Sequence, residues 1–160
     1  MKLQTLALAG ALLLAYPVHA QVPVTAATDH DSLLASADPK LASNKRLVYD
    51  FWREVLEAGR LDQADKYLAE DYIQHNPNVP TGRAAFVEFF SKFSKAKPVD
   101  TRIKAPLVAI SAEGDKVILS FVRTVADPKE AGKRYTTTWF DMFRIEQGKI
   151  AEHWDSAIKE

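Results

Sequence analysis

The C-terminal segment from Tyr135 to Ile158 constrains the fold more than any other part of the chain. Its pattern is typical of two strands joined by a short Gln147-Gly148 turn. Side chains along a strand alternate between its two faces. One face of the first strand therefore carries a largely aromatic and apolar set: Tyr135, Thr137, Trp139, Asp141, Phe143 and Ile145. The segment predicts a β-hairpin in which one apolar face holds a single acid.

Asp141 is the first candidate for chemistry, because a carboxylate among large apolar rings is costly to keep charged unless it is paired or hydrated. An acid in such surroundings indicates proton transfer or specific recognition. A second interpretation stays open, in which an arginine holds Asp141 or its side chain faces water. The opposite face, with Phe140 and Met142, is also partly apolar, so alternation alone does not decide between the two.

The first 20 residues are typical of a secretory signal peptide. Lys2 provides the positive start, and the apolar core Leu6–Tyr16 is too short to span a bilayer comfortably. We expect cleavage after Ala20, with an uncleaved N-terminal anchor as the competing interpretation. No cysteine follows the apolar core, which argues against a lipoprotein anchor. The predicted location is periplasmic or secreted, with no membrane association after cleavage.

The charge balance argues against nucleic acid as a partner. The chain has 21 Lys+Arg and 21 Asp+Glu, and removal of residues 1–20 takes away only Lys2, which leaves a net charge of −1. A balanced chain of this kind has no basic surface for nucleic acid or an anionic membrane. The remaining length, about 140 residues, is that of one domain.

The order of predicted elements indicates an α+β fold. Residues 21–38 lack periodicity and predict a flexible lead-in, so we place the domain at 39–160. Helical patterns begin at Pro39 and Asp62 and recur over Phe86–Phe93. The predicted strands are Tyr72–His75, Ile103–Ser111, Lys116–Ala126, Tyr135–Glu146 and Lys149–Ile158. Such an order is typical of helices gathered on one face of an antiparallel sheet.

His75 is the first candidate partner for Asp141. It shares a face with Ile73, whose apolar side chain is expected to point inward, so His75 is expected in a pocket. There it could exchange a proton near neutral pH. The alternative is a buried histidine that bonds to the backbone near a turn.

His153 is a second candidate, and its orientation stays open. If Ile150 and Trp154 face the core, strict alternation turns His153 to the other side of the sheet, where it would be a dimer contact. A β-bulge would reverse this orientation.

Motifs for cofactors and metals are missing from the sequence. It has no glycine-rich dinucleotide fingerprint, phosphate loop, paired-cysteine site or nucleophile elbow. His75, His153, Asp141 and Asp155 lack the short-range spacing of metal ligands. We therefore expect neither a cofactor nor a metal.

Three segments together resemble the SnoaL-like polyketide cyclase family of the nuclear transport factor 2-like superfamily, over residues 41–158. They are Asn44–Phe51, Tyr72–Pro77 with Gly82 after it, and Phe140–Ile145 followed by Gly148–Ile150 and Glu152–Asp155. The resemblance implies a cone-shaped α+β barrel, with N-terminal helices packed in a strongly curved antiparallel sheet and a pocket at the open end. It also implies a homodimer joined through the sheet.

The resemblance further implies an acid/base aspartate for a cofactor-independent aldol closure, which falls on Asp141, while His75 matches a recurrent histidine. The predicted signal peptide is a departure from the family, whose polyketide reactions usually take place in the cytoplasm. It argues against a polyketide substrate but not against the fold. We thus expect an exported acid–base enzyme (aldol cyclase, isomerase or lyase type) for a small apolar carbonyl compound. Its expected substrate-binding residues are Asn76, Tyr49, Trp52, Trp139, Phe143 and His153.

Two other hypotheses stay open. The chain could be a non-catalytic periplasmic ligand-binding or dimerisation module. It could also be an interaction domain with a filled cone, in which Arg123 or Arg144 bonds to Asp141.

Overall fold

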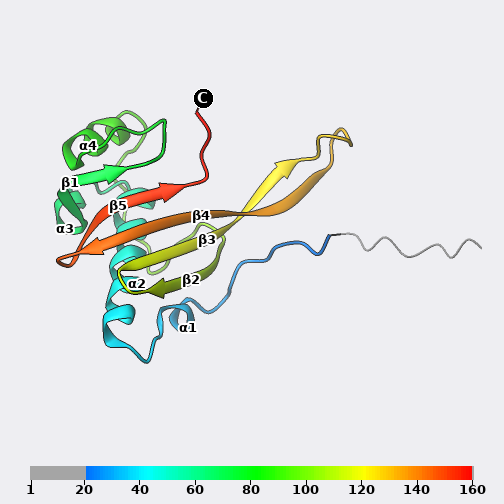
Figure 1. The fold of residues 1–160 in the computed structure, drawn as a ribbon. Coiled ribbons are helices and arrows are strands. Elements are labelled where there is room, and N and C mark those ends of the chain that lie inside the picture. The colour runs from blue at the N-terminus through cyan, green and yellow to red at the C-terminus, as the bar shows by residue number, and fades with distance from the viewer. Residues whose placement is uncertain (1–20, 160) are drawn as a thin grey trace, which may run out of the picture.

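The computed structural model describes residues 21–159, so the predicted signal peptide lies outside the described part of the chain. A run of helical elements comes first, β1 and α4 follow, and the remaining strands come last (Figure 1). The helical elements are α1 (His30–Leu34), α2 (Pro39–Phe51), η1 (Trp52–Glu57), η2 (Leu61–Gln63), α3 (Ala64–Tyr67) and α4 (Arg83–Ser91). The strands are β1 (Leu68–Gln74), β2 (Leu107–Glu113), β3 (Lys116–Ala126), β4 (Arg134–Glu146) and β5 (Lys149–Asp155).

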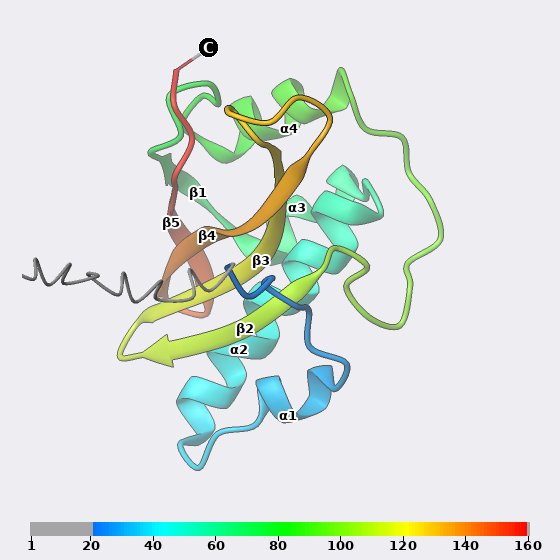
Figure 2. The same cartoon turned by 90° about the vertical axis from the view of Figure 1, so that its right-hand side faces the viewer.

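The strands form one curved sheet in the order β1-β5-β4-β3-β2. Helices α2, α3 and α4 lie on the same side of it (Figure 2). This arrangement confirms the predicted α+β cone. Two details differ from the expectation of an antiparallel barrel: β1 pairs with β5 in parallel, and β1 and β2 remain as separate edges, so the sheet is not closed. Two parallel neighbours need a long connection between them, and α4 with its loops and β2–β4 provides it between β1 and β5.

The C-terminal hairpin forms as predicted. Strands β4 and β5 pair antiparallel, and Gln147 and Gly148 connect them with φ of 50° and 73°. Positive φ at both central residues gives a turn whose twist matches that of the strands, and glycine adopts it without strain. The β3–β4 hairpin extends past the rest of the sheet (Figure 1).

Helix α2 begins where the sequence predicted. The Asp38 side chain accepts hydrogen bonds from the backbone N–H groups of Lys40 and Leu41 at 2.7 and 3.3 Å, and Pro39 takes the first helical position. The helix continues into the π-helical segment η1, and the chain then turns at Gly59, whose φ is 65°. A Cβ at Gly59 would lie 2.7 Å from the carbonyl oxygen of Lys95, so this close approach requires glycine.

The segment 21–38, expected to be a flexible lead-in, contains helix α1 and contacts the rest of the domain. Asp29 caps α1, and Leu34 is buried in the core. The backbone N–H of Ala27 also donates to the carbonyl of Leu107 at 2.8 Å. Because α1 is only five residues long, its sequence carries too little periodicity to predict it.

Aromatic rings from helices and sheet form the core. The Phe51 ring centroid lies 6.0, 6.0 and 6.1 Å from those of Tyr67, Phe86 and Phe143. All four side chains are buried, and burial of each phenylalanine contributes about 1.5–3 kcal/mol. Within residues 21–159, no helix has both the length and the apolar character needed to cross a membrane.

Candidate active site

A cavity of about 560 Å³ lies between the inner face of the sheet and helices η1 and α4. Most of its wall is aromatic or aliphatic, and all of its polar side chains except Ser94 come from the strands or the loop after β1. The apolar lining is Phe51, Trp52, Leu56, Tyr72, Val79, Phe86, Phe89, Phe90, Phe93 and Phe143. The polar lining is Gln74, Asn76, Ser94, Asp141, His153 and Asp155. An apolar cavity with a few convergent polar groups is the usual form of a small-molecule site.

Strand β4 places Asp141 at the polar end of the cavity, which is the first of the two interpretations that its alternation left open. Asp141 and Phe143 are both buried and face inward, whereas Phe140 on the other face is exposed. In the antiparallel pairing, Asp141 lies opposite Asp155 of β5. Two carboxylates opposite each other on one face repel unless each has its own partner.

A β-bulge turns His153 into the cavity. Ile145 pairs with Ile150 while Arg144 pairs with Glu152, so Ala151 is an extra residue in β5. Both Ile150 and His153 are therefore buried, which strict alternation does not allow. The structure thus realises the bulged alternative, and it is His153 that bonds to Asp141.

Asp141 and His153 form a buried pair. Nε2 of His153 lies 3.0 Å from Oδ1 of Asp141, and Asp141 is only 4% exposed. The other carboxylate oxygen, Oδ2, is buried and has no hydrogen-bond partner among the described residues. A buried carboxylate oxygen without a partner is rare in proteins, and at a cavity wall it is free to act on a ligand.

Gln74 of β1 determines where the protons of this pair lie. Its Oε1 accepts the backbone N–H of Asn76 at 3.0 Å, which fixes the orientation of the amide, and it lies 2.7 Å from Nδ1 of His153. Because Oε1 can only accept, Nδ1 must carry a hydrogen. One further proton then lies between Nε2 of His153 and Oδ1 of Asp141, since two lone pairs would otherwise face each other.

Asp155 has separate partners. Its Oδ2 accepts a hydrogen bond from Nδ2 of Asn76 at 2.7 Å, and its Oδ1 accepts the backbone N–H of Ala157 at 2.9 Å. Asn76 was predicted to bind substrate, and it lines the cavity while it holds this carboxylate. The two facing acids are therefore stabilised by different neighbours, a histidine and an amide.

His75, predicted as the catalytic partner of Asp141, lies on the outer face of the sheet, and the predicted pairing is wrong. Its ring stacks on Trp154 with 4.9 Å between centroids, and its Nε2 lies 2.7 Å from Glu152. The prediction assumed that Ile73 points inward. Instead the larger ring of Tyr72 is buried and Ile73 is 40% exposed, because the aromatic ring fills the space beside Phe86.

Hydrogen bonds from His75 and then from Arg144 lower the pKa of Glu152 below its ordinary value. These three side chains form an ion-pair cluster on the outer face, where Nε of Arg144 lies 2.7 Å from Glu152. The predicted alternative in which Arg144 or Arg123 bonds to Asp141 is therefore also wrong. Arg123 instead lies over the ring of Trp139, 4.8 Å from its centroid.

The other predicted binding residues divide into two groups. Trp52, Phe143, His153 and Asn76 line the cavity, and Trp52 also stacks on Phe121 with 4.4 Å between centroids. Trp139 faces the same way as Asp141 but is not among the lining residues. Tyr49 is also absent from the lining, because its hydroxyl accepts the backbone N–H of Ile103 at 3.1 Å and bonds to His30 at 2.8 Å.

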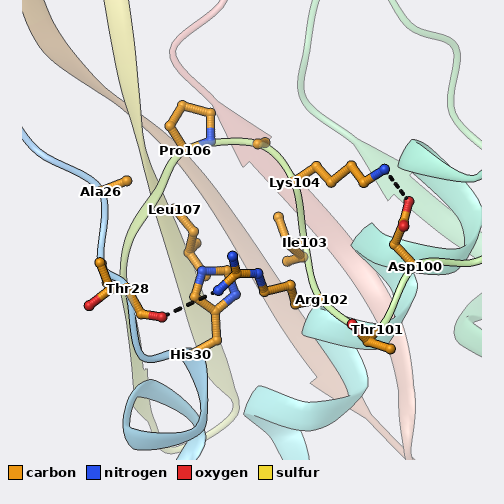
Figure 3. Close-up of a pocket in the computed structure, with 12 residues that line it drawn as sticks. Ala26, Thr28, His30, Asp100, Thr101, Arg102, Ile103, Lys104, Pro106 and Leu107 are labelled. Atoms are coloured by element: carbon orange, nitrogen blue, oxygen red, sulfur yellow. Dashed lines mark hydrogen bonds and ion pairs between the residues drawn. The ribbon is translucent and has the colours of Figure 1, made fainter.

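A second cavity, of about 530 Å³, lies between the lead-in and residues 100–107 (Figure 3). Arg102 donates to the carbonyl of Thr28 at 3.4 Å, and Lys104 pairs with Asp100 at 2.8 Å. The titratable side chains that line it are exposed or, for His30, half-buried. Because these groups are already paired or open to solvent, the first cavity is the better candidate for function.

Sequence reasoning missed Gln74 and Tyr72 as parts of the site, along with the phenylalanines of α4. The sequence does contain a clue to Gln74 and Tyr72, because either Tyr72 or its neighbour Ile73 must face inward on β1. If the larger Tyr72 faces inward, Gln74 lies on the same face. Within residues 21–159, Asp141, His153 and Asp155 each offer one ligand atom within 4.8 Å of the others, so this group could hold a metal ion. They come from two strands, which is why their sequence spacing resembles no metal motif.

The fold and the cavity together define a small-molecule-binding protein of the α+β cone class. The profile of the SnoaL-like domain matches residues 48–153. The chain therefore belongs to the SnoaL-like family. No match was found among curated protein sequences.

Solved structures share the fold of this chain. A candidate polyketide cyclase from Acidithiobacillus ferrooxidans is 20% identical with a TM-score of 0.51, over 76% of this chain and 89% of the other. An LEH-like epoxide hydrolase from M. tuberculosis is 16% identical with a TM-score of 0.51, over 73% and 84%. A candidate SnoaL-like polyketide cyclase from Jannaschia sp. CCS1 is 16% identical with a TM-score of 0.50, over 76% and 91%. At these identities the likeness concerns the fold alone.

Proposed function

We propose that this chain is a cofactor-independent acid–base enzyme for a small apolar carbonyl compound. The observation that carries the proposal is the buried Oδ2 of Asp141, which has no partner among the described residues while Oδ1 is bonded to His153. A general base needs a lone pair directed at its substrate and a partner that keeps the group in place. Asp141 and His153 provide these two elements at the wall of one cavity.

The proposed chemistry begins with proton removal from the carbon next to the carbonyl. When His153 holds the shared proton, Asp141 is a carboxylate, and Oδ2 takes the substrate proton. The resulting enolate then attacks a second carbonyl in the same molecule, receives a proton at another carbon, or expels a leaving group. These outcomes correspond to cyclase, isomerase and lyase reactions, and the shape of the bound substrate selects among them.

The apolar character of the ligand is inferred from the cavity wall. Phe86, Phe89, Phe90 and Phe93 follow one another along α4 and its end, opposite the strands that carry the acids. Such a wall offers dispersion contacts and few hydrogen bonds, so it favours a hydrocarbon skeleton. The polar end can then take one or two oxygen atoms.

The test is the exchange of hydrogen for deuterium next to the carbonyl of 2-tetralone, an apolar bicyclic ketone, in D2O. Wild-type protein is expected to accelerate the exchange, and Asp141→Asn is expected to lose it while keeping its fold. Asp71→Asn is the matched control, because Asp71 is an exposed acid on β1. Exchange by Asp141→Asn at the wild-type rate would contradict the assignment of Asp141.

The second candidate function is a non-catalytic ligand-binding module, which the same cavity favours. In that case 2-tetralone raises the melting temperature of wild type and Asp141→Asn equally, and neither protein exchanges its hydrogens. The two functions thus differ in turnover, not in binding.

Export and dimerisation are further parts of the proposal. Residues 1–20 support export, and the mass of the protein recovered from the periplasm or medium would test cleavage after Ala20. Phe140 is 50% exposed and Ile73 40% exposed on the outer face of the sheet, which supports a homodimer through that face. Light scattering on wild type and on Phe140→Asp tests this, and a monomeric wild type would contradict it.

A further inference from the structure

The amide of Gln74 orients a second side chain besides His153. Its Oε1 accepts the backbone N–H of Asn76, so its Nε2 is the donor on the other side. Nε2 lies 3.0 Å from the hydroxyl oxygen of Tyr72. An amide nitrogen cannot accept a hydrogen bond, so the Tyr72 oxygen is the acceptor in this contact.

The hydroxyl hydrogen of Tyr72 is therefore left for another partner. Among residues 21–159, the only hydrogen bond of the Tyr72 side chain is the one that it accepts from Gln74. Tyr72 lines the cavity, and its ring is held edge-to-face against Phe86 with 5.9 Å between centroids. A buried donor without an acceptor is unfavourable, and a ligand oxygen in the cavity would supply one.

The surroundings keep this hydroxyl protonated. Burial is the main cause that raises the pKa of Tyr72, and the negative charges of Asp155 and Asp141 raise it further. The hydroxyl lies near the polar end of the cavity, because the Gln74 amide that it bonds to also contacts His153. Tyr72 is on β1 and Asp141 on β4, and β5 with His153 lies between them. A ligand that lies over β5 can contact both.

We infer that the Tyr72 hydroxyl is a hydrogen-bond donor to an oxygen of the ligand, so that the cavity selects apolar molecules with a carbonyl oxygen at the end that meets Asp141. The consequence for catalysis rests on the proposed function, whereas the preference in binding does not. In the reaction, the donor would stabilise the negative charge that develops on the carbonyl oxygen as Asp141 removes the neighbouring proton.

Infrared spectroscopy of bound 2-tetralone is the primary test. In wild type at saturating ketone, the carbonyl stretch is expected at lower frequency than in an apolar solvent, because the oxygen accepts a hydrogen bond. Tyr72→Phe keeps the ring and removes the hydroxyl, so the stretch is expected to return towards the value in the apolar solvent. Tyr135→Phe is the control, since Tyr135 is exposed and outside the cavity.

Affinity gives a second readout that does not depend on turnover. Tyr72→Phe is expected to lower the affinity for 2-tetralone by about fivefold to tenfold, the range of one hydrogen bond. The affinity for tetralin, which has no oxygen, is expected to stay unchanged. An equal loss for both ligands would indicate damage to packing and would contradict the inference. An unshifted carbonyl stretch in wild type, or no binding of 2-tetralone, would contradict it without any variant.

Turnover separates this inference from the proposed function. If both hold, Tyr72→Phe lowers the rate of deuterium exchange by about 10²–10³-fold, with a smaller effect on KM. If the infrared shift depends on Tyr72 but Asp141→Asn still exchanges hydrogens, the donor assignment stands and the proposed base is wrong. If Asp141→Asn loses exchange and Tyr72→Phe retains both exchange and infrared shift, the base stands and the donor assignment is overturned.

Discussion

Gln74 and His153 are partners on the parallel strands β1 and β5, and the amide oxygen of Gln74 lies 2.7 Å from Nδ1 of His153. This contact fixes which ring nitrogen carries a hydrogen and leaves the other for Asp141. We therefore predict that nitrogen NMR of His153 in wild type shows a protonated Nδ1. A neutral ring protonated only at Nε2 would contradict the arrangement.

Removal of the Gln74 amide should disturb catalysis more than ligand binding. Gln74→Leu lets the His153 ring rotate and change tautomer, and we expect the rate of 2-tetralone exchange to fall by about 10–100-fold. The affinity for tetralin should stay close to that of wild type, because the apolar wall is unchanged. Gln147→Leu, at the exposed turn between β4 and β5, is the control. Equal rates in Gln74→Leu and wild type would remove Gln74 from the positioning role.

Two phenylalanines of the same helical region should behave differently. Phe86 is 2% exposed and contacts Phe51 and Tyr72, so Phe86→Ala is expected to lower the free energy of unfolding by about 3–5 kcal/mol. Phe93 is 73% exposed although it lines the cavity, so Phe93→Ala should change that free energy by less than about 0.5 kcal/mol.

The same Phe93→Ala variant should bind tetralin more weakly than wild type, because it loses apolar contact with the ligand. Denaturant unfolding and ligand titration measure the two effects separately. A loss of stability in Phe93→Ala as large as that in Phe86→Ala would show that Phe93 belongs to the core instead.

The cap of α2 gives a prediction about stability alone. Asp38→Ala removes the acceptor for two backbone N–H groups, and we expect a loss of about 1 kcal/mol and a decrease of a few degrees in Tm. Asp38→Asn keeps an acceptor oxygen and should lose less. Exchange of 2-tetralone should be unchanged in both variants below Tm, because α2 reaches the cavity only at its last residue, Phe51, and Asp38 is not among the lining residues.

The ion-pair cluster on the outer face predicts a pH dependence. His75 and Arg144 lower the pKa of Glu152 in the folded state, so the resulting stabilisation is present above the unfolded pKa of about 4.3 and is lost as pH falls through the folded pKa. Wild type should therefore be more stable than Glu152→Gln at pH 7, by up to about 1 kcal/mol, and the difference should shrink below about pH 4. If the stability difference between wild type and Glu152→Gln grew as the pH fell, it would contradict a stabilising role of this ion-pair cluster.

Much of the fold could be predicted, because the hairpin alternation, the Asp38-Pro39 start of α2 and the Gln147-Gly148 turn are local signals. For Asp141 the strand pattern left two interpretations open, and the structure buries its side chain on the inward face. The parallel pairing of β1 could not be predicted in this way, since it depends on the path of the chain between Gln74 and Leu107. Helix α1 was too short to give a periodic signal.

The site was harder to predict than the fold because its polar residues depend on two irregularities. The bulge at Ala151 reverses the face of His153, and the inward position of Tyr72 reverses that of His75. Each change moves a histidine to the opposite face of the sheet. His153 therefore contacts Asp141 in the cavity, and His75 instead joins the ion-pair cluster on the outer face. Tyr49 was misplaced for a different reason, since its hydroxyl bonds to the backbone of Ile103, a partner 54 residues away.

The most direct test of the central claim is the rate of deuterium exchange of 2-tetralone in wild type and Asp141→Asn at saturating ketone. A general base contributes about 10²–10⁴-fold, so we predict that the variant is slower by at least about 100-fold. Its affinity for tetralin should remain within about twofold of wild type, because the apolar cavity wall is intact. A tenfold loss of affinity would require a change of about 1.4 kcal/mol in the free energy of binding. Equal exchange rates in the two proteins would contradict the claim that Asp141 is the base.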